Sequence, residues 1–189
     1  FHEAVDLLEK DDQLVVATVI RTKGSTPQKP GAKLLVRADG SGVGTLGGGC
    51  VEGDIWFAAT QLMKGRGSAE YREYQLNEDL AAEDGLVCGG TMYFLIDPVY
   101  RPEDYLDYAR EIDSAYEGGG AVALASLIKP GPGSDAPLGS NRGLYDYSTG
   151  LMRVSLDLVS TPQGSATAVI KKEIDQMLKQ WIPVNTIIR

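Results

Sequence analysis

The chain has 189 residues, and its 18 basic and 26 acidic residues give a net charge of −8. This balance argues against general nucleic-acid binding, and no apolar run approaches the roughly 18 residues that a membrane span needs. The single histidine, His2, excludes a multi-histidine metal site and leaves little for a Ser-His-Asp mechanism. Two cysteines are too few for a disulfide scaffold, so we expect a reducing, cytoplasmic setting.

Apolar periodicity and turn residues predict an α/β protein, with α+β as the close alternative, built on a mixed β-sheet flanked by helices. Short β-branched runs indicate strands, and longer runs with helical spacing indicate helices. Helices are expected over residues 2–10, from Cys50 to about 64, over 102–116 and over 166–181, and strands over 14–20, 33–37, 42–46, 70–76, 91–96, 121–128 and 184–188.

A weak internal repeat is also expected. The strand at 121–128 runs into a Lys-Pro-Gly-Pro-Gly loop, much as the strand at 14–20 runs into a loop with Lys-Gly-Ser-Thr-Pro. A turn at 148–150 then stands where Asp39 and Gly40 stood in the first copy. The second copy has no cysteine, so it would lack the chemistry of the first.

Both cysteines lie in turns that glycines leave bare. Cys50 follows three glycines, 47–49, and precedes a run that is compatible with a helix, whereas Cys88 precedes Gly89 and Gly90. A helix N-terminus favours a thiolate, although two small buried hydrophobes in tight turns are the plainer interpretation. Glu52 either orients a ligand or acts as a base, or it is a first-turn carboxylate that complements the helix dipole.

The segment between Gln13 and Ala38 reverses the charge of the chain, because it has basic residues and no acidic ones. Such a segment suits an anionic ligand, but lysines also protect the solvated edges of sheets. The glycines form neither a dinucleotide-binding nor a P-loop fingerprint. The basic residues are Arg21, Lys23, Lys29, Lys33 and Arg37.

Three motifs, in this order, resemble those of the XdhC/CoxI family of xanthine dehydrogenase accessory factors. They are Gly24-Ser25-Thr26-Pro27 with Pro30-Gly31-Ala32-Lys33, then Gly44 to Glu52, then Gly85 to Gly90. The resemblance covers residues 1–100, which we expect to form the motif-bearing domain, with 101–189 as an additional α/β segment or small subdomain. The chain shows no glycine-rich nucleotide turn of the Rossmann domain that family members commonly have at their C-terminus, and Gln28 stands where an arginine is often found.

The resemblance implies a cytoplasmic maturation factor or chaperone, more an accessory protein than an enzyme. It would bind the molybdenum cofactor (molybdopterin) transiently and deliver it to a molybdenum hydroxylase such as xanthine dehydrogenase. A cysteine desulfurase is a further expected partner, and a homodimer is left open. Nucleic acid and membranes are not expected partners.

Glycine turns and lysines suit the phosphate of such a cofactor, and thiolates suit its metal or the incoming sulfur. Cys50 and Cys88 are therefore the predicted metal contacts. Two other interpretations stay open: a thiol-dependent sulfurtransferase or redox enzyme that uses these cysteines, and a structural protein whose glycines only shape turns. The predicted cofactor-binding residues are Lys23, Gly24, Ser25, Thr26, Lys29, Lys33, Gly47, Gly48, Gly49, Cys50, Glu52, Cys88, Gly89 and Gly90.

Overall fold

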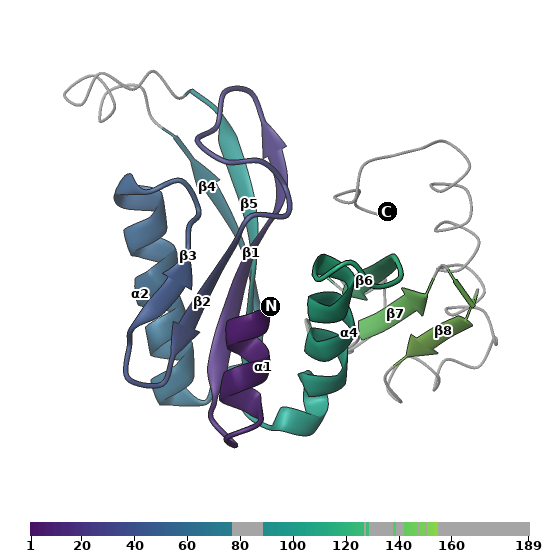
Figure 1. The fold of residues 1–189 in the computed structure, drawn as a ribbon. Coiled ribbons are helices and arrows are strands. Elements are labelled where there is room, and N and C mark those ends of the chain that lie inside the picture. Colours follow the sequence, from purple (N-terminus) through teal and green to yellow (C-terminus); the bar gives the residue numbers. More distant parts are fainter. Residues whose placement is uncertain are drawn as a thin grey trace, which may run out of the picture. The chain divides into compact units, whose positions relative to one another are not determined.

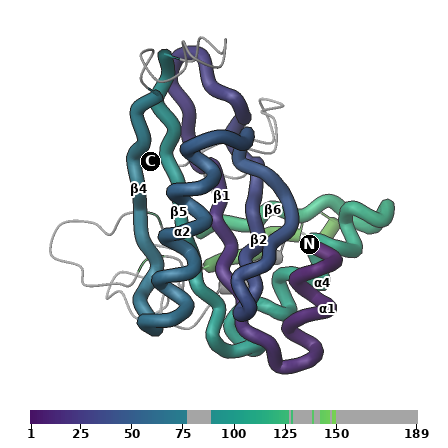
Figure 2. Tube along the Cα trace, turned by 90° about the vertical axis from the view of Figure 1, so that its left-hand side faces the viewer, coloured from purple at the N-terminus to yellow at the C-terminus, as the bar shows by residue number. Residues whose placement is uncertain are grey.

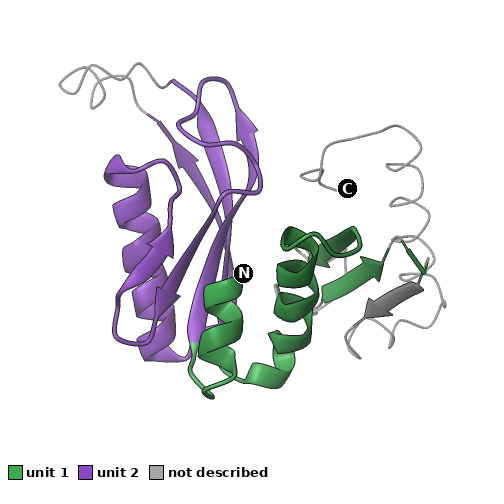
Figure 3. Ribbon diagram, viewed as in Figure 1, with its two compact units in different colours: residues 1–13, 99–189 green, residues 14–98 purple. Residues whose placement is uncertain are grey.

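The computed structural model describes residues 1–76, 89–126, 128, 138, 142–146, 148–149 and, for the backbone alone, 151–154. The chain divides into two compact units, one formed by residues 14–98 and the other by residues 1–13 together with 99–189 (Figure 3). The two are described separately. The assignment of the motifs to a functional domain over 1–100 stays a prediction.

The unit of residues 14–98 is built on a five-stranded sheet with the order β3-β2-β1-β5-β4 (Figure 1). β1 pairs with β2, β2 with β3, and β4 with β5, all antiparallel. The end of β1 lies beside the start of β5, since a Cβ on Gly90 would come within 2.6 Å of the Lys23 carbonyl oxygen. The strands are β1 (Leu14–Lys23), β2 (Lys33–Arg37), β3 (Gly42–Gly44), β4 (Glu70–Gln75) and β5 (Thr91–Val99).

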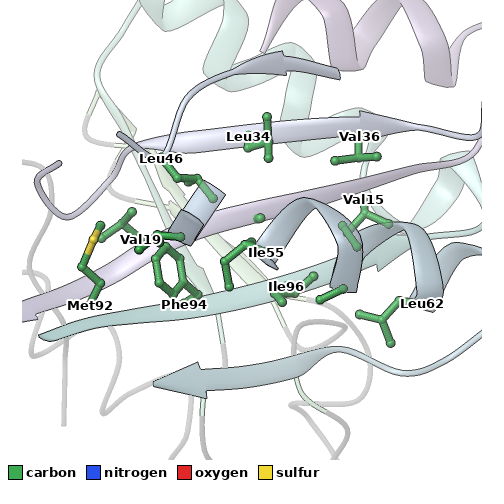
Figure 4. Packing of buried hydrophobic residues seen from close by; sticks show 14 residues of the cluster. Val15, Val19, Leu34, Val36, Leu46, Ile55, Leu62, Met92, Phe94 and Ile96 are labelled. Atoms are coloured by element: carbon green, nitrogen blue, oxygen red, sulfur yellow. The ribbon is translucent and has the colours of Figure 1, made fainter. Parts of the chain in front are cut away.

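Helix α2 (Gly49–Gly65) covers one face of this sheet and passes in front of the strands in Figure 2. Its apolar residues recur at helical spacing, and they meet every second residue of the strands, as the two periodicities require. The helix ends at Arg66, which adopts the left-handed conformation, and Gly67 N–H returns to the Leu62 carbonyl. The core beneath α2 consists of Val15, Ala17, Val19, Leu34, Val36, Leu46, Val51, Ile55, Ala58, Ala59, Leu62, Met92, Phe94 and Ile96 (Figure 4).

The second unit combines two helices with a smaller sheet. α1 (His2–Leu8) packs against α4 (Leu106–Tyr116), and a short 3₁₀ turn, η1 (Pro102–Asp104), precedes α4. Arg110 binds Glu9 across this helix pair, with an N–O distance of 2.8 Å. The smaller sheet is antiparallel with the order β6-β7-β8, and its strands are β6 (Val122–Ser126), β7 (Arg142–Asp146) and β8 (Leu151–Val154).

The predicted repeat is visible in the turns of the two sheets. β1-β2-β3 and β6-β7-β8 are each three consecutive antiparallel strands. In the first, the Asp39 carboxylate accepts hydrogen bonds from the N–H and hydroxyl of Ser41, at 2.8 and 2.6 Å. In the second, Asp146 accepts the same pair from Ser148, at 2.8 and 2.7 Å. The same aspartate turn therefore closes the second hairpin of each sheet.

The predicted fold class is confirmed, and the antiparallel pairing favours its α+β alternative. Several boundaries differ from the predictions: β1 runs to Lys23 rather than residue 20, β3 ends at Gly44 rather than residue 46, and two further differences involve prolines. β5 continues through Pro98, two residues beyond the end of its pairing with β4 at Ile96, so no hydrogen bond to β4 needs the N–H that this proline lacks. The helix expected from Pro102 begins as a 3₁₀ turn, and α4 starts only at Leu106. The helix and strand expected over 166–181 and 184–188 lie outside the described residues.

No helix within the described part of the chain is long and apolar enough to cross a membrane.

Candidate functional site

The glycine turn between β3 and α2 lies at one end of the sheet. Gly47, Gly48 and Gly49 have φ values of 112°, 74° and 66°, a left-handed conformation that disfavours other residues. A Cβ on Gly47 would lie 2.7 Å from the Cβ of Pro27, so the turn packs against the loop that follows β1. The turn and this loop are thus brought together in space.

The third glycine segment meets the same loop. A Cβ on Gly24 would lie 3.2 Å from the Cα of Gly90, and one on Gly90 would overlap the Ser25 carbonyl oxygen. Only glycines allow two backbones to approach this closely. The structure therefore gathers the Lys23–Pro27 loop, the Gly47–Gly49 turn and Gly90 at one end of the sheet.

Cys50 is the second residue of α2, and its side chain is exposed. The predicted position of this thiol at a helix N-terminus is confirmed. Cys88 lies outside the described residues, so its pairing with Cys50 on a metal stays a prediction. Among the described residues, no group of three or more His, Cys, Asp or Glu side chains is arranged to hold a metal ion.

Glu52 accepts hydrogen bonds from the residues of the glycine turn. Its Oε2 accepts hydrogen bonds from Thr45 Oγ1 at 2.7 Å, from Leu46 N–H at 2.7 Å and from Gly48 N–H at 3.2 Å. These donors lower the pKa of Glu52, with the Thr45 hydroxyl the largest cause, so the carboxylate is charged at neutral pH. Of the alternatives that the sequence left open, the geometry resembles the helix-start carboxylate, although its donors come mainly from the turn.

Two polar residues that sequence reasoning missed lie beside Cys50. Tyr74 on β4 is hydrogen-bonded to Asp54, and burial, this bond and the nearby Cys50 raise the pKa of the phenol. Asp54 lies four residues after Cys50, on the same side of the helix, so its position was readable from the sequence. The position of Tyr74 beside Cys50 could not be predicted from the sequence, because it depends on how β4 pairs with β5.

The three predicted lysines differ in their surroundings. Lys23 and Lys29 are exposed at the two ends of the loop. Lys33 instead is half-buried at the start of β2, where its Nζ donates to Thr18 Oγ1 at 3.0 Å and burial lowers its pKa to about 8. Its predicted role as a ligand contact stays untested, but the structure gives it internal partners. Within the loop, Thr26 Oγ1 donates to the Gln28 carbonyl at 2.9 Å.

This arrangement defines an α+β fold in which three glycine-rich segments meet at one end of a sheet, and one of them leads into a helix start that carries an exposed thiol. Residues 7–75 match the model of the XdhC and CoxI family. The predicted family is therefore confirmed, and this segment of the chain belongs to it.

Three relatives agree with this assignment. The chain is 30% identical over 132 residues to a probable xanthine dehydrogenase subunit of Bacillus subtilis, an alignment of 68% of this chain and 38% of that protein. It is 35% identical over 88 residues to the molybdenum cofactor insertion chaperone PaoD of Escherichia coli, an alignment of 46% of this chain and 27% of that protein. A crystal structure described as a xanthine dehydrogenase from Bacillus halodurans matches with a TM-score of 0.56 and 25% identity, over 80% of this chain and 44% of that one. The chain thus spans less than half the length of each.

Proposed function

We propose that this protein binds the molybdenum cofactor and delivers it to a molybdenum hydroxylase such as xanthine dehydrogenase during maturation of that enzyme. The relatives support a role of this kind, since one is named a molybdenum cofactor insertion chaperone and another a probable xanthine dehydrogenase subunit. The observation that carries the proposal is the exposed Cys50 thiol, which follows the glycine turn that meets the other two segments at one end of the sheet. The role is that of an accessory protein, and a cytoplasmic setting and a homodimer stay predictions.

The residues at the site fit this cofactor. Molybdenum held by a dithiolene is a soft metal centre, for which thiolate is a suitable ligand, and Cys50 offers an accessible one. No heavy atom of the described residues lies within 4 Å of a Cβ built on Gly48 or Gly49, so the outer side of the turn is open. Lys23 and Lys29 are exposed and positive, as a phosphate requires. The proposed contacts are Cys50 and Cys88 for the metal, and Lys23, Gly24, Ser25, Thr26, Lys29, Gly89 and Gly90 for the rest of the cofactor.

Retention of the cofactor tests this function. The full chain is incubated with released molybdenum cofactor and passed through a desalting column, and bound molybdenum and pterin are then measured. Cys50→Ala should lose most of the retained molybdenum, whereas Gln61→Ala, an exposed change further along the same helix, should retain as much as the wild type. A wild-type chain that retains no cofactor, or a Cys50→Ala variant that retains it fully, would count against the proposal.

The exposure of Cys50 also favours a second candidate, a sulfur carrier. Its thiolate would attack the outer sulfur of a persulfide on a cysteine desulfurase, forming a new S–S bond while the desulfurase thiolate leaves with the electron pair of the old one. Incubation with a desulfurase and cysteine should then add the mass of one sulfur atom to the peptide that contains Cys50. If alkylated controls show no such adduct, the sulfur carrier is rejected and the binding role is unaffected.

A further inference from the structure

The inner face of the glycine turn is already occupied by an anion that belongs to the chain. Glu52 lies in the first turns of α2, and its Oε2 accepts from Thr45, Leu46 and Gly48 at 2.7, 2.7 and 3.2 Å. Thr45 Oγ1 also accepts from Gly47 N–H at 3.1 Å. The donors on this side of the turn, which a bare glycine sequence offers to an external anion, are therefore satisfied from within.

The glycine turn is also fixed by a buried side chain next to it. The Leu46 side chain is fully buried in the core under α2, while its N–H bonds to Glu52. Glu52 reaches back to Gly48, the N-cap residue of its own helix, in the manner of a capping box. Both ends of the turn are thus tied to fixed points, and Cys50 follows two residues after Gly48. The position of the thiol depends on this tie.

The two sides of the glycine turn differ in whether they are occupied by a side chain of the protein. The N–H groups of Leu46 and Gly48 point to Glu52, whereas the outer side, at Gly48 and Gly49, is open next to the exposed Cys50. A ligand on the open side meets a thiol and bare backbone. It does not meet the donors that hold the carboxylate, unless it displaces Glu52.

We propose that Glu52 is a positioning residue: its carboxylate is the built-in anion of the Thr45–Gly48 turn and holds Cys50 in place, without contacting the ligand. The proposal refines the function proposed above and rests on it for the identity of the ligand. It assigns the metal end of the cofactor to the open side of this turn. The phosphate of the cofactor would then bind to the Lys23–Thr26 loop rather than to the N–H groups of the glycine turn.

The first test uses the ligand-free full chain and chemical rescue. In Glu52→Ala, the Leu46 and Gly48 amides should exchange hydrogen about tenfold faster than in the wild type, as expected for a lost charged hydrogen bond of about 1.4 kcal/mol. Acetate should restore their protection, and neutral acetamide should not. Alkylation of Cys50 by iodoacetamide, followed by peptide mass, should change in rate in the variant and return towards the wild-type rate with acetate.

The controls separate positioning from general stability. Glu52→Gln, which keeps an oxygen acceptor, should be affected less than Glu52→Ala. Glu73→Ala, an exposed change on β4, should leave both measurements unchanged. Unchanged exchange at Leu46 and Gly48 in Glu52→Ala would overturn the proposal, and so would equal effects of acetate and acetamide.

Cofactor retention then decides between positioning and competition. Glu52→Ala should retain less molybdenum cofactor than the wild type, and acetate should recover part of the loss. Tighter retention by Glu52→Ala would overturn the proposal, because it would mean that the phosphate takes the vacated donors. Since the exchange and alkylation measurements need no cofactor, they test the role of Glu52 even if the wild-type chain proves not to bind the cofactor.

Discussion

Lys33 differs from the other lysines of its segment because its surroundings lower the pKa of its side chain. It lies opposite Thr18 in the β1–β2 register and donates to the hydroxyl of that residue at 3.0 Å. Burial lowers its pKa, and the charge of Asp97, which is only 6% exposed, works in the opposite direction. Burial prevails, so the pKa falls from 10.5 to about 8. Lys33 is thus a half-buried member of the sheet.

This pKa predicts a pH dependence of stability. Between pH 8 and 10.5 the unfolded chain keeps the Lys33 proton and the folded chain releases it, so the contribution of Lys33 to the free energy of unfolding rises with pH. The rise amounts to about 3 kcal/mol at most. In urea titrations, the stability difference between the wild type and Lys33→Gln should grow in favour of the wild type over this range. Lys29→Gln, at an exposed position in the adjoining loop, should give a constant difference, and parallel curves for Lys33→Gln would contradict the prediction.

The sequence allowed part of this residue-level picture to be predicted. The place of Cys50 at a helix start follows from local features, namely three glycines and then an apolar run with helical spacing. The half-buried position of Lys33 could not be predicted, because it depends on which strands flank β2 and in what register. Charge counting treated all the lysines of the segment alike, whereas burial distinguishes Lys33 from Lys23 and Lys29.

At the scale of elements, local patterns were sufficient where one face of an element is apolar. The helix expected from Cys50 to about residue 64 is α2 (Gly49–Gly65), and the strand expected at 33–37 is β2. Two of the differences involve prolines, where pairing with neighbouring strands matters more than propensity. Pro98 lies in β5 beyond the end of the pairing with β4 at Ile96, and the place where that pairing ends cannot be predicted from the residues around the proline.

The junction of the loops at the site yields a prediction at this scale. Gly90→Ala should destabilise the protein by about 1–3 kcal/mol, because the new Cβ would meet the carbonyl oxygens of Ser25 and Lys23 and one backbone would have to move. The contrasting variant is Gly53→Ala in α2, where no described heavy atom outside the helix backbone lies within 4 Å of the new Cβ. It should add about 0.5–1 kcal/mol. Urea unfolding measures both, and a Gly90→Ala variant as stable as Gly53→Ala would show that the two segments are not in contact.

At the scale of the whole molecule, one of the two compact units is built from segments that are far apart in the sequence. Residues 14–98 form one unit, while α1 at the beginning of the chain belongs with residues after 98. α1 is held there by α4, through the Glu9–Arg110 ion pair and a hydrogen bond of 3.2 Å between His2 and Asp113. The pairing of two helices about a hundred residues apart could not be predicted from the sequence, and the motif-bearing domain over 1–100 stays a prediction.

The two compact units should lose their protection separately. Leu8→Ala, at a buried position of α1, and Phe94→Ala, in the core beneath α2, should each cost about 2–5 kcal/mol. In hydrogen exchange followed by mass spectrometry, Leu8→Ala should speed exchange mainly in α1 and α4, and Phe94→Ala mainly in β1, β2, β5 and α2, because compact units open independently. Asp107→Asn, exposed on α4, should alter neither pattern. If both core variants speed exchange equally in all of these elements, the chain unfolds as one cooperative body, and a change at α1 would then also weaken the turn that holds Cys50.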